Sequence, residues 1–217
     1  MIRARSLYKN PGGYYDIMIA IIDYQMGNLR SVQKAFEYIG YDAIVSREPH
    51  RILDASHVVL PGVGAFGDAV LNLERAGLIE AIYKSVKAGK PFLGICLGLQ
   101  LLFEKSHEGG LFAGLSLLPG EVKRLPEHLN IKVPHMGWNE LQYRPNPIFK
   151  YLEQSCFVYF VHSYYVEPAN SGDIIATAFY GVNIPVAVNR ENIYGVQFHP
   201  EKSGREGLKI LNNFARL

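Results

Sequence analysis

The sequence has few cysteines, no long apolar run and almost no excess charge, and each shortage excludes a class of protein. Two cysteines, Cys96 and Cys156, are too few for a disulfide scaffold and fit a reducing cytoplasm. No apolar run reaches the roughly 18 residues of a membrane helix, so a soluble cytoplasmic protein is expected. The net charge of +2 comes from residues 1–17, and the rest of the chain is neutral. A nucleic-acid or membrane partner is therefore not expected.

A chain of 217 residues is long enough for one well-buried domain. Residues 1–17 lack apolar periodicity and contain an Asn-Pro-Gly-Gly turn signal, so we expect an N-terminal extension outside the core. The run MIAIID, which starts at Met18, is typical of a strand buried on both faces of a parallel sheet. No repeat or low-complexity linker follows, so residues 18–217 are predicted to form a single domain.

Helical and strand patterns alternate in the first half of the chain. Helices are expected over residues 28–39, with Asn28 as N-cap, and over 68–88, and strands near 43–45, 57–60 and 91–96. This βαβ order favours a doubly wound sheet. The second half has short β-rich segments at about 120–124, 139–142, 157–166, 173–180, 184–189 and 193–198, before a closing helix at about 204–215. We predict a three-layer α/β/α fold with a flavodoxin-like mixed sheet.

The segment Gly94-Ile95-Cys96-Leu97-Gly98 places a cysteine between a buried strand and an apolar helix. Glycines flank it at the two positions where a side chain would clash, which is the pattern of a nucleophile elbow. Such a turn exposes the sulfur at the carboxyl edge of the sheet, and the N-terminus of the next helix favours the thiolate. A free cysteine is also commonly just a small buried hydrophobe, so this segment alone leaves both interpretations open.

A second motif, Gln197-Phe198-His199-Pro200-Glu201, follows the apolar strand IYGV near the end of the chain. A histidine at a strand end can act as general base for a thiol, and a nearby carboxylate can orient its imidazole. Because open α/β sheets build their sites at the carboxyl ends of strands, Cys96, His199 and Glu201 are predicted to meet at one rim of the sheet.

The run GICLGLQLL around Cys96 and the run GVQFHPEKS around His199 resemble the two signature blocks of class I glutamine amidotransferases. The resemblance extends over almost all of residues 18–217. It implies that Cys96 attacks the side-chain amide of glutamine, that His199 carries the proton to departing ammonia, and that Glu201 holds His199. The fold, too, would be of this family's type. Neither a cofactor nor a metal is expected.

Attack on a carboxamide creates an oxyanion that needs preorganised N–H donors. The backbone N–H of Leu97 is one candidate, and the second is expected from Gly62, Val63 or Gly64 in the PGVG loop. Glycines on both sides of Val63 would let that peptide rotate, so we expect the oxyanion hole to be incomplete at rest and assembled when the partner is loaded. Glycines that only make a tight turn are the alternative interpretation.

Glutamine must also be held at its α-amino and α-carboxylate groups. By resemblance, the binding groups are Gln100, Glu108, Ser163 and Tyr164. Glu108 suits an ammonium group, although a glutamate near a Gly-Gly turn is commonly a solvated charge. His162 is interpreted as a packed or hydrogen-bonded core residue rather than a second base.

Three further segments are similar to one branch of this family: DYQMGN at 23–28, PGVGAF at 61–66 and PHMGWN at 134–139. The resembled branch supplies ammonia to a cyclase subunit with a (β/α)8 barrel in histidine biosynthesis, which implies a heterodimer. By the same resemblance, Trp138, Tyr159 and Lys202 would face the partner. Tryptophan is also a favoured interface anchor. The alternative interpretation of residues 134–139 is a proline-glycine turn with the tryptophan buried for packing.

Three alternatives remain open. The glutaminase of pyridoxal phosphate synthesis would use the same chemistry, although residues 23–28 and 134–139 speak against it. A catalytically silent relative could keep the fold as a binding subunit, and the intact Cys96, His199 and Glu201 speak against that. An ordinary cysteine peptidase would cleave peptides without a partner.

Overall fold

The computed structural model describes residues 17–126 and 131–217. The predicted N-terminal extension, residues 1–17, lies outside the described residues except for Ile17. The first strand, β1, begins at Met18, where the apolar run begins. None of the helices in the described ranges is long and apolar enough to cross a membrane.

The centre of the molecule is an eight-stranded mixed sheet in the order β2-β1-β3-β4-β14-β13-β12-β9. The first five strands in this order are parallel and the last three are antiparallel to their neighbours. Side chains of β3 and β4 are buried throughout, as expected of strands covered on both faces. The bounds are β1 Met18–Ile22, β2 Asp42–Ser46, β3 His57–Gly62, β4 Phe92–Cys96, β9 Gln142–Tyr143, β12 Ile174–Tyr180, β13 Val182–Arg190 and β14 Ile193–Val196.

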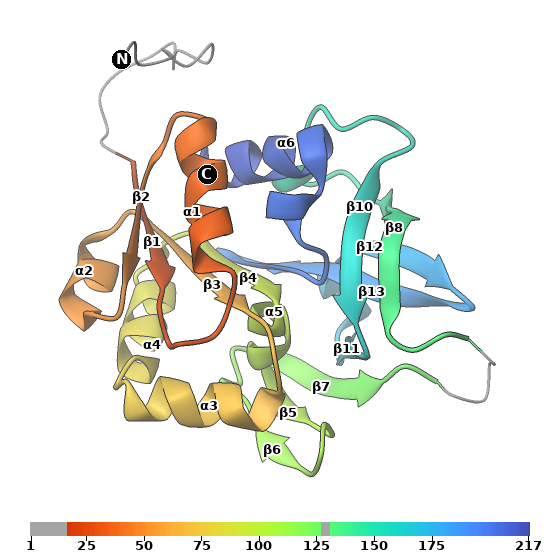
Figure 1. Ribbon diagram of the computed structural model, residues 1–217, viewed down its shortest axis with the longest axis horizontal. Coiled ribbons are helices and arrows are strands. Elements are labelled where there is room, and N and C mark those ends of the chain that lie inside the picture. Colours follow the sequence, from red (N-terminus) through yellow and green to blue (C-terminus); the bar gives the residue numbers. More distant parts are fainter. Residues whose placement is uncertain (1–16, 127–130) are drawn as a thin grey trace.

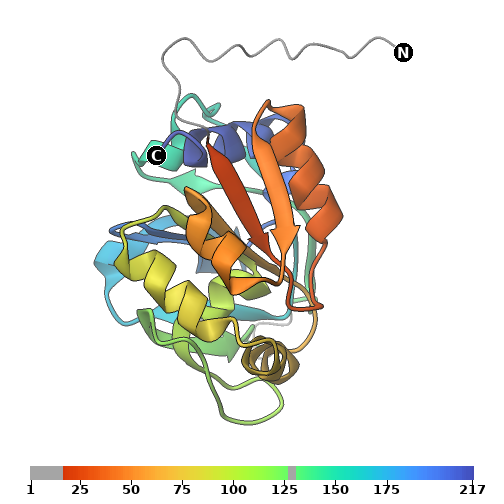
Figure 2. The same ribbon diagram turned by 90° about the vertical axis from the view of Figure 1, so that its left-hand side faces the viewer.

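Helices cover both faces of the sheet, so the predicted three-layer α/β/α fold is confirmed (Figures 1 and 2). One face packs against α1 (Leu29–Tyr38) and α6 (Gly204–Phe214), which lie side by side in Figure 1. The other face packs against α2 (Pro49–Asp54), α3 (Phe66–Arg75), α4 (Ile79–Lys87) and α5 (Leu97–Leu101). The apolar stripe predicted for residues 28–39 is the buried face of α1.

Two smaller sheets accompany the central sheet in the described part of the chain. One has the order β11-β7-β5-β6 and the other pairs β10 with β8. Their strands are β5 Phe103–Ser106, β6 Phe112–Ala113, β7 Leu118–Arg124, β8 His135–Glu140, β10 Phe157–His162 and β11 Tyr164–Pro168. Short 3-10 helices are η2 (Pro147–Phe149), η3 (Ser171–Asp173) and η4 (Pro200–Lys202).

Several predicted elements differ from the structure in detail. The strand expected at 157–166 is divided at Ser163, because β10 and β11 belong to different sheets. The helical pattern over 68–88 is two helices, since the chain turns at Gly77 with a positive φ of 66°. Asn28 stands at the N-cap position of α1, but its side chain makes no capping hydrogen bond.

Candidate active site

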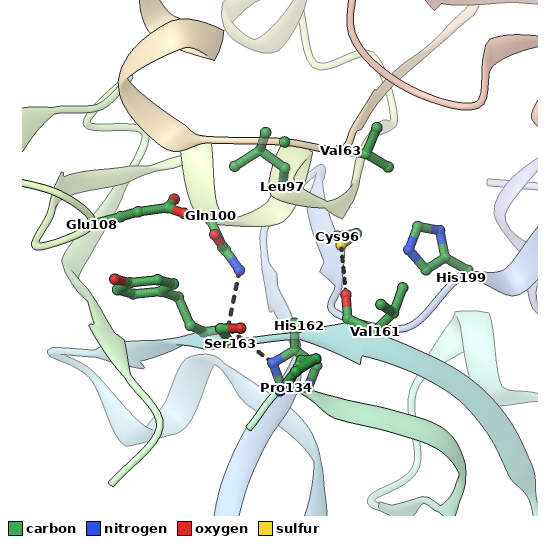
Figure 3. A pocket seen from close by; sticks show the side chains of 12 residues that line it. Val63, Cys96, Leu97, Gln100, Glu108, Pro134, Val161, His162, Ser163 and His199 are labelled. Atoms are coloured by element: carbon green, nitrogen blue, oxygen red, sulfur yellow. Dashed lines mark hydrogen bonds between the residues drawn. The ribbon is translucent and has the colours of Figure 1, made fainter. Parts of the chain in front are cut away.

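The carboxyl ends of three neighbouring strands meet at one rim of the central sheet. Gly62 at the end of β3 pairs with Cys96 at the end of β4, and Ile95 pairs with Val196 at the end of β14. This register brings the PGVG loop, the cysteine and the segment before His199 together. They open into a cavity of about 310 Å³ (Figure 3), lined by Val63, Gly64, Cys96, Leu97, Gln100, Glu108, Pro134, Val161, His162, Ser163, Tyr164 and His199.

Cys96 has a strained backbone, with φ at 55° and ψ at −110°. A non-glycine residue in this region costs about 1–2 kcal/mol, which the surrounding packing must offset. The turn depends on Gly98, because a Cβ there would lie 1.7 Å from the carbonyl oxygen of Leu60. A Cβ on Gly94 would likewise meet the backbone of Gly98 at 2.7 Å. The clash positions predicted from the sequence are therefore confirmed, although the helix that follows, α5, is only five residues long.

The sulfur of Cys96 lies among polar groups from other elements. Its S–H donates to the carbonyl oxygen of Val161 at 3.9 Å, and the amide nitrogen of Gln197 donates to the sulfur at 3.6 Å. Figure 3 shows the imidazole of His199 beside the sulfur. Nε2 of His199 is buried and has no hydrogen-bond partner among the residues that the structure describes. The sulfur and the imidazole are thus neighbours in the cavity, but no hydrogen bond joins them.

His199 and Glu201 form a buried pair. Nδ1 of His199 lies 2.9 Å from Oε1 of Glu201, and the two side chains are 2% and 1% exposed. Burial lowers the pKa of His199, but interactions with the Cys96 sulfur and the Glu201 carboxylate outweigh it and raise the pKa to about 9. The imidazole is therefore held as a cation at neutral pH, with Nε2–H available to the cavity.

Gln100 and Tyr164 belong to a buried hydrogen-bond chain. Nε2 of Gln100 donates to the carbonyl oxygen of Tyr164 at 3.1 Å, and Nδ1–H of His162 donates to the same oxygen at 2.9 Å. Nε2 of His162 accepts from Nδ1 of His135 at 2.9 Å, and His135 in turn accepts from Asn139 at 3.2 Å. Burial lowers the pKa of His162 to about 3 and that of His135 to about 4, so both are neutral. His162 is thus a hydrogen-bonded buried residue, as interpreted, although it also lines the cavity.

The PGVG loop packs against the first loop of the chain. A Cβ on Gly62 would lie 2.3 Å from the hydroxyl of Tyr24, and one on Gly64 would lie 2.6 Å from Met26. Gly64 has a φ of 103°, and Val63 is 41% exposed. Val63 and Gly64 line the cavity together with Leu97, whereas Gly62 stands behind them, paired with Cys96. The four predicted oxyanion-hole residues therefore gather around the sulfur.

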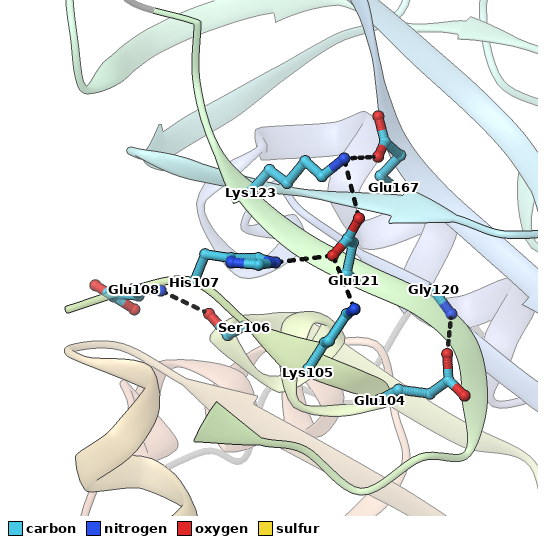
Figure 4. Close-up of polar contacts among 9 residues, drawn as sticks. All are labelled: Glu104, Lys105, Ser106, His107, Glu108, Gly120, Glu121, Lys123 and Glu167. Carbon is cyan, nitrogen blue, oxygen red and sulfur yellow. Dashed lines mark hydrogen bonds and ion pairs between the residues drawn. The ribbon is translucent and has the colours of Figure 1, made fainter. Parts of the chain in front are cut away.

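Glu108 lines the cavity and is not a free solvated charge. Its Oε2 accepts the backbone N–H of Phe66 at 2.9 Å, so it is tied to the first turn of α3, directly after the PGVG loop. The strand before it is anchored by charges (Figure 4): Glu121 contacts Lys105, His107 and Lys123 at 3.3, 2.8 and 3.0 Å. Hydrogen bonds from His107 and Lys123 lower the pKa of Glu121 to about 2.

The residues predicted to face a partner also lie together. Trp138 on β8 pairs with Tyr159 on β10, and their rings meet edge to face at 6.1 Å. Lys202 is the last residue of η4, and His199 directly precedes this short helix. The backbone N–H of His199 donates to the carbonyl oxygen of Tyr159 at 2.9 Å, which brings η4 close to β10. Trp138 is 57% exposed, so the packing interpretation of the tryptophan is wrong.

Sequence reasoning missed four residues of this site. Val161 and Pro134 line the cavity, Gln197 contacts the sulfur, and the Tyr24 hydroxyl is buried near Gly62 with no partner in the described part of the chain. Burial, and then the charge of Cys96, raise the pKa of Tyr24. Gln197 was within the quoted motif, but only the fold shows what its side chain meets.

A thiol, an imidazolium and an orienting carboxylate converge on one cavity at this rim. This arrangement suits hydrolysis of a carboxamide through a thioester. Comparison with known proteins narrows this class. Residues 20–217 match the family model described as glutamine amidotransferase class-I. Imidazole glycerol phosphate synthase subunit HisH of Moorella thermoacetica is 54% identical over 92% of this chain and 94% of its own length, and that of Geobacter metallireducens is 52% identical over 91% and 97%.

Solved structures agree in fold. A crystal structure of a glutamine amidotransferase has a TM-score of 0.72 at 19% identity and covers 92% of this chain and 99% of its own. The structure of PurLQS from Thermotoga maritima has a TM-score of 0.72 at 18% identity, covering 93% and 99%. The chain belongs to the class I glutamine amidotransferases and, among them, to the family of imidazole glycerol phosphate synthase HisH subunits.

Proposed function

We propose that this chain is the glutaminase subunit of imidazole glycerol phosphate synthase, with Cys96, His199 and Glu201 as its catalytic triad. The observation that carries the proposal is the strained Cys96 facing a buried His199–Glu201 pair across one cavity. Residues 18–217 are the amidotransferase domain. A reduced thiol at Cys96 suits a cytoplasmic location.

In the first half of the reaction, the thiolate of Cys96 attacks the side-chain carbonyl carbon of glutamine. The C=O electrons move to the oxygen, and the oxyanion takes hydrogen bonds from the backbone N–H of Leu97 and of the Gly62–Gly64 loop. When the tetrahedral intermediate collapses, the C–N bond breaks and His199 gives its proton to the departing nitrogen. Ammonia leaves, and a γ-glutamyl thioester remains on Cys96.

In the second half, His199 is neutral and takes a proton from water as the water oxygen attacks the thioester. The C–S bond breaks and glutamate is released, which returns Cys96 as thiolate and His199 as imidazolium. Glu201 stabilises the imidazolium in both halves, because its carboxylate lies 2.9 Å from Nδ1.

Glutamine would be recognised at its α-amino and α-carboxylate groups by Gln100, Glu108, Ser163 and Tyr164, all of which line the cavity. Glu108 carries the charge that suits the ammonium group. Because its other oxygen is bonded to Phe66 N, bound substrate would be linked to the start of α3 and to the loop that precedes it. The resting PGVG loop is proposed to complete its oxyanion hole only when the partner is loaded.

The ammonia would pass to a cyclase subunit with a (β/α)8 barrel, in a heterodimer that forms imidazole glycerol phosphate and aminoimidazole carboxamide ribotide for histidine biosynthesis. The exposed Trp138, with Tyr159 and Lys202, is proposed as part of the docking face. Enclosed transfer matters because ammonia in bulk water would protonate to a poor nucleophile. Similarity to HisH subunits favours this acceptor over that of pyridoxal phosphate synthesis.

The test is glutamate release measured with and without the candidate cyclase subunit and its nucleotide ligand. Strong stimulation by the loaded partner is expected. The Cys96→Ala variant should be inactive, while Cys156→Ala, which changes the other buried free cysteine, should keep activity. Unchanged activity in Cys96→Ala, or peptide cleavage without a partner, would contradict the proposal. A folded and inactive wild-type chain in the loaded complex would favour a silent binding subunit.

A further inference from the structure

Gln197 has no assigned role, yet it is fully buried beside the nucleophile. Its side-chain nitrogen donates to the sulfur of Cys96 at 3.6 Å, and its side-chain oxygen accepts from Nε2 of Gln100 at 3.0 Å. Its backbone N–H is used separately, by the carbonyl of Val186 at 2.8 Å. The side chain thus has one polar neighbour on each side, and one of them is the reacting atom.

The neighbours fix which end of the amide faces the sulfur. The carbonyl of Tyr164 can only accept hydrogen bonds, so Gln100 must present its NH2 group there. The same nitrogen of Gln100 approaches Gln197, which must therefore present its oxygen. The NH2 group of Gln197 is left pointing at Cys96. A flipped amide would place two donors against each other.

This orientation matters most when the sulfur is ionised. The neutral thiol donates its proton to Val161 O, but a thiolate has no proton to donate and would face that oxygen as one acceptor beside another. A thiolate then depends on donors that already point at it. Hydrogen bonds to an ionised acceptor are roughly twice as strong as neutral ones, so the N–H of Gln197 favours the thiolate over the thiol.

We propose that Gln197 is a further catalytic residue, whose buried amide, oriented by Gln100 and the Tyr164 carbonyl, donates a hydrogen bond that stabilises the Cys96 thiolate before attack. The proton that the sulfur loses on ionisation is the one that Nε2 of His199 holds in the imidazolium, so the thiolate–imidazolium pair forms without any other reactant. The link to glutamine hydrolysis rests on the proposed function, whereas the effect on the sulfur does not.

Other titratable groups face the same sulfur or cavity and are held constant in the test. They are the Tyr24 hydroxyl from the loop after β1, His162 at the end of β10, Tyr164 at the start of β11, His199 after β14 and Glu108 from the turn after β5. Glu201 acts through His199. None of them is altered by a substitution at Gln197.

The test is Gln197→Met, which keeps an unbranched side chain of similar size and removes the donor. Alkylation of Cys96 by iodoacetamide is followed from pH 5 to 10 by mass spectrometry in the folded chain. Cys156 serves as an internal reference, because burial raises its pKa to about 11. We expect the pH midpoint for Cys96 to rise by about one unit, with about tenfold slower alkylation at low pH. The matched control is Gln33→Met on α1, whose amide donates to the Ala43 carbonyl, and its midpoint should not move.

An unchanged midpoint in a folded Gln197→Met chain would overturn the inference. Should that variant fail to fold, the side-chain NH2 resonances of Gln197 in the wild type give the answer. The chemical shifts of these resonances should change with pH as the sulfur ionises, and this change should be absent in Cys96→Ala. Chemical shifts that do not respond to ionisation of the sulfur would refute the contact. In the loaded complex, Gln197→Met should lower kcat about tenfold with little change in KM. If the wild type hydrolyses no glutamine, the proposed function fails while the alkylation result still stands.

Discussion

Replacing Glu201 by glutamine should move the alkaline limit of glutaminase activity to lower pH. The catalytic form needs a protonated His199, and the raised pKa of about 9 keeps it protonated through neutral pH. Glu201→Gln keeps the shape of the side chain and removes its charge. The imidazolium then loses its ionic partner at Nδ1 but remains buried at 2% exposure. Burial lowers the pKa of His199, and without the carboxylate charge less remains to oppose this effect.

The size of the shift follows from the geometry. A hydrogen bond to a charged group contributes about 1.5–3 kcal/mol, and one pKa unit corresponds to 1.36 kcal/mol. Loss of the charge on a buried partner at 2.9 Å should therefore lower the pKa of His199 by about one to two units. The alkaline limb would move from near pH 9 to about pH 7–8, and the variant would lose most activity at pH 8.5 and less at pH 6.5.

The measurement is kcat/KM for glutamate release from pH 6 to 10 in the complex loaded with nucleotide ligand. Glu80→Gln is the matched control, because it removes the charge of an exposed carboxylate that pairs with Lys84 on α4. Its profile should coincide with that of the wild type. An alkaline limb that stays at pH 9 in Glu201→Gln would refute the idea that this carboxylate sets the protonation of His199.

Three further predictions concern folding, pH and partner binding. Gly98→Ala should cost about 3 kcal/mol or more in urea unfolding, because its Cβ would meet Leu60 O at 1.7 Å, whereas Gly77→Ala, with open space around the Cβ, should cost about 1 kcal/mol. Burial lowers the pKa of His57 to about 4 in the folded chain, so as the pH falls this histidine is protonated in the unfolded chain before it is protonated in the folded one. Stability should fall by up to about 1.4 kcal/mol per pH unit for this histidine between pH 6.5 and 4, and His57→Gln should flatten that slope. Trp138→Ala should weaken binding of the cyclase by at least about 30-fold while the melting temperature of the free subunit stays unchanged.

Much of the fold could be predicted from the sequence, because parallel strands buried on both faces leave long apolar runs. MIAIID, HVVL and PFLGIC became β1, β3 and β4, with Met18 and Cys96 at the expected ends. The β-rich half was harder. A nearly continuous apolar pattern over 157–166 gives no sign that the chain changes sheets at Ser163, since that depends on which strands are available for pairing.

Some residues of the site could likewise be predicted from the sequence, and others could not. Cys96 and the His199–Glu201 pair lie in short motifs whose spacing is itself the signal, so their meeting could be predicted. Val161 contacts the sulfur through its carbonyl oxygen, which any residue would supply, so no side-chain pattern could reveal this contact. Gln197 gives a signal only once Gln100 is known to lie 3.0 Å away, although the two are far apart in the chain.

The surroundings of the sulfur explain why the elbow motif alone does not define an enzyme. The strained turn at Cys96 depends on close packing of α5 on β3 and β4, and that packing by itself only places a cysteine in a buried turn. The polar groups that can act on the sulfur come later in the chain: Val161 from β10, and Gln197 and His199 from the segment after β14. Ionisation of the thiol therefore depends on correct docking of the β-rich half against the parallel strands. A substitution that loosens this docking should lower the reactivity of Cys96 before it unfolds the parallel core.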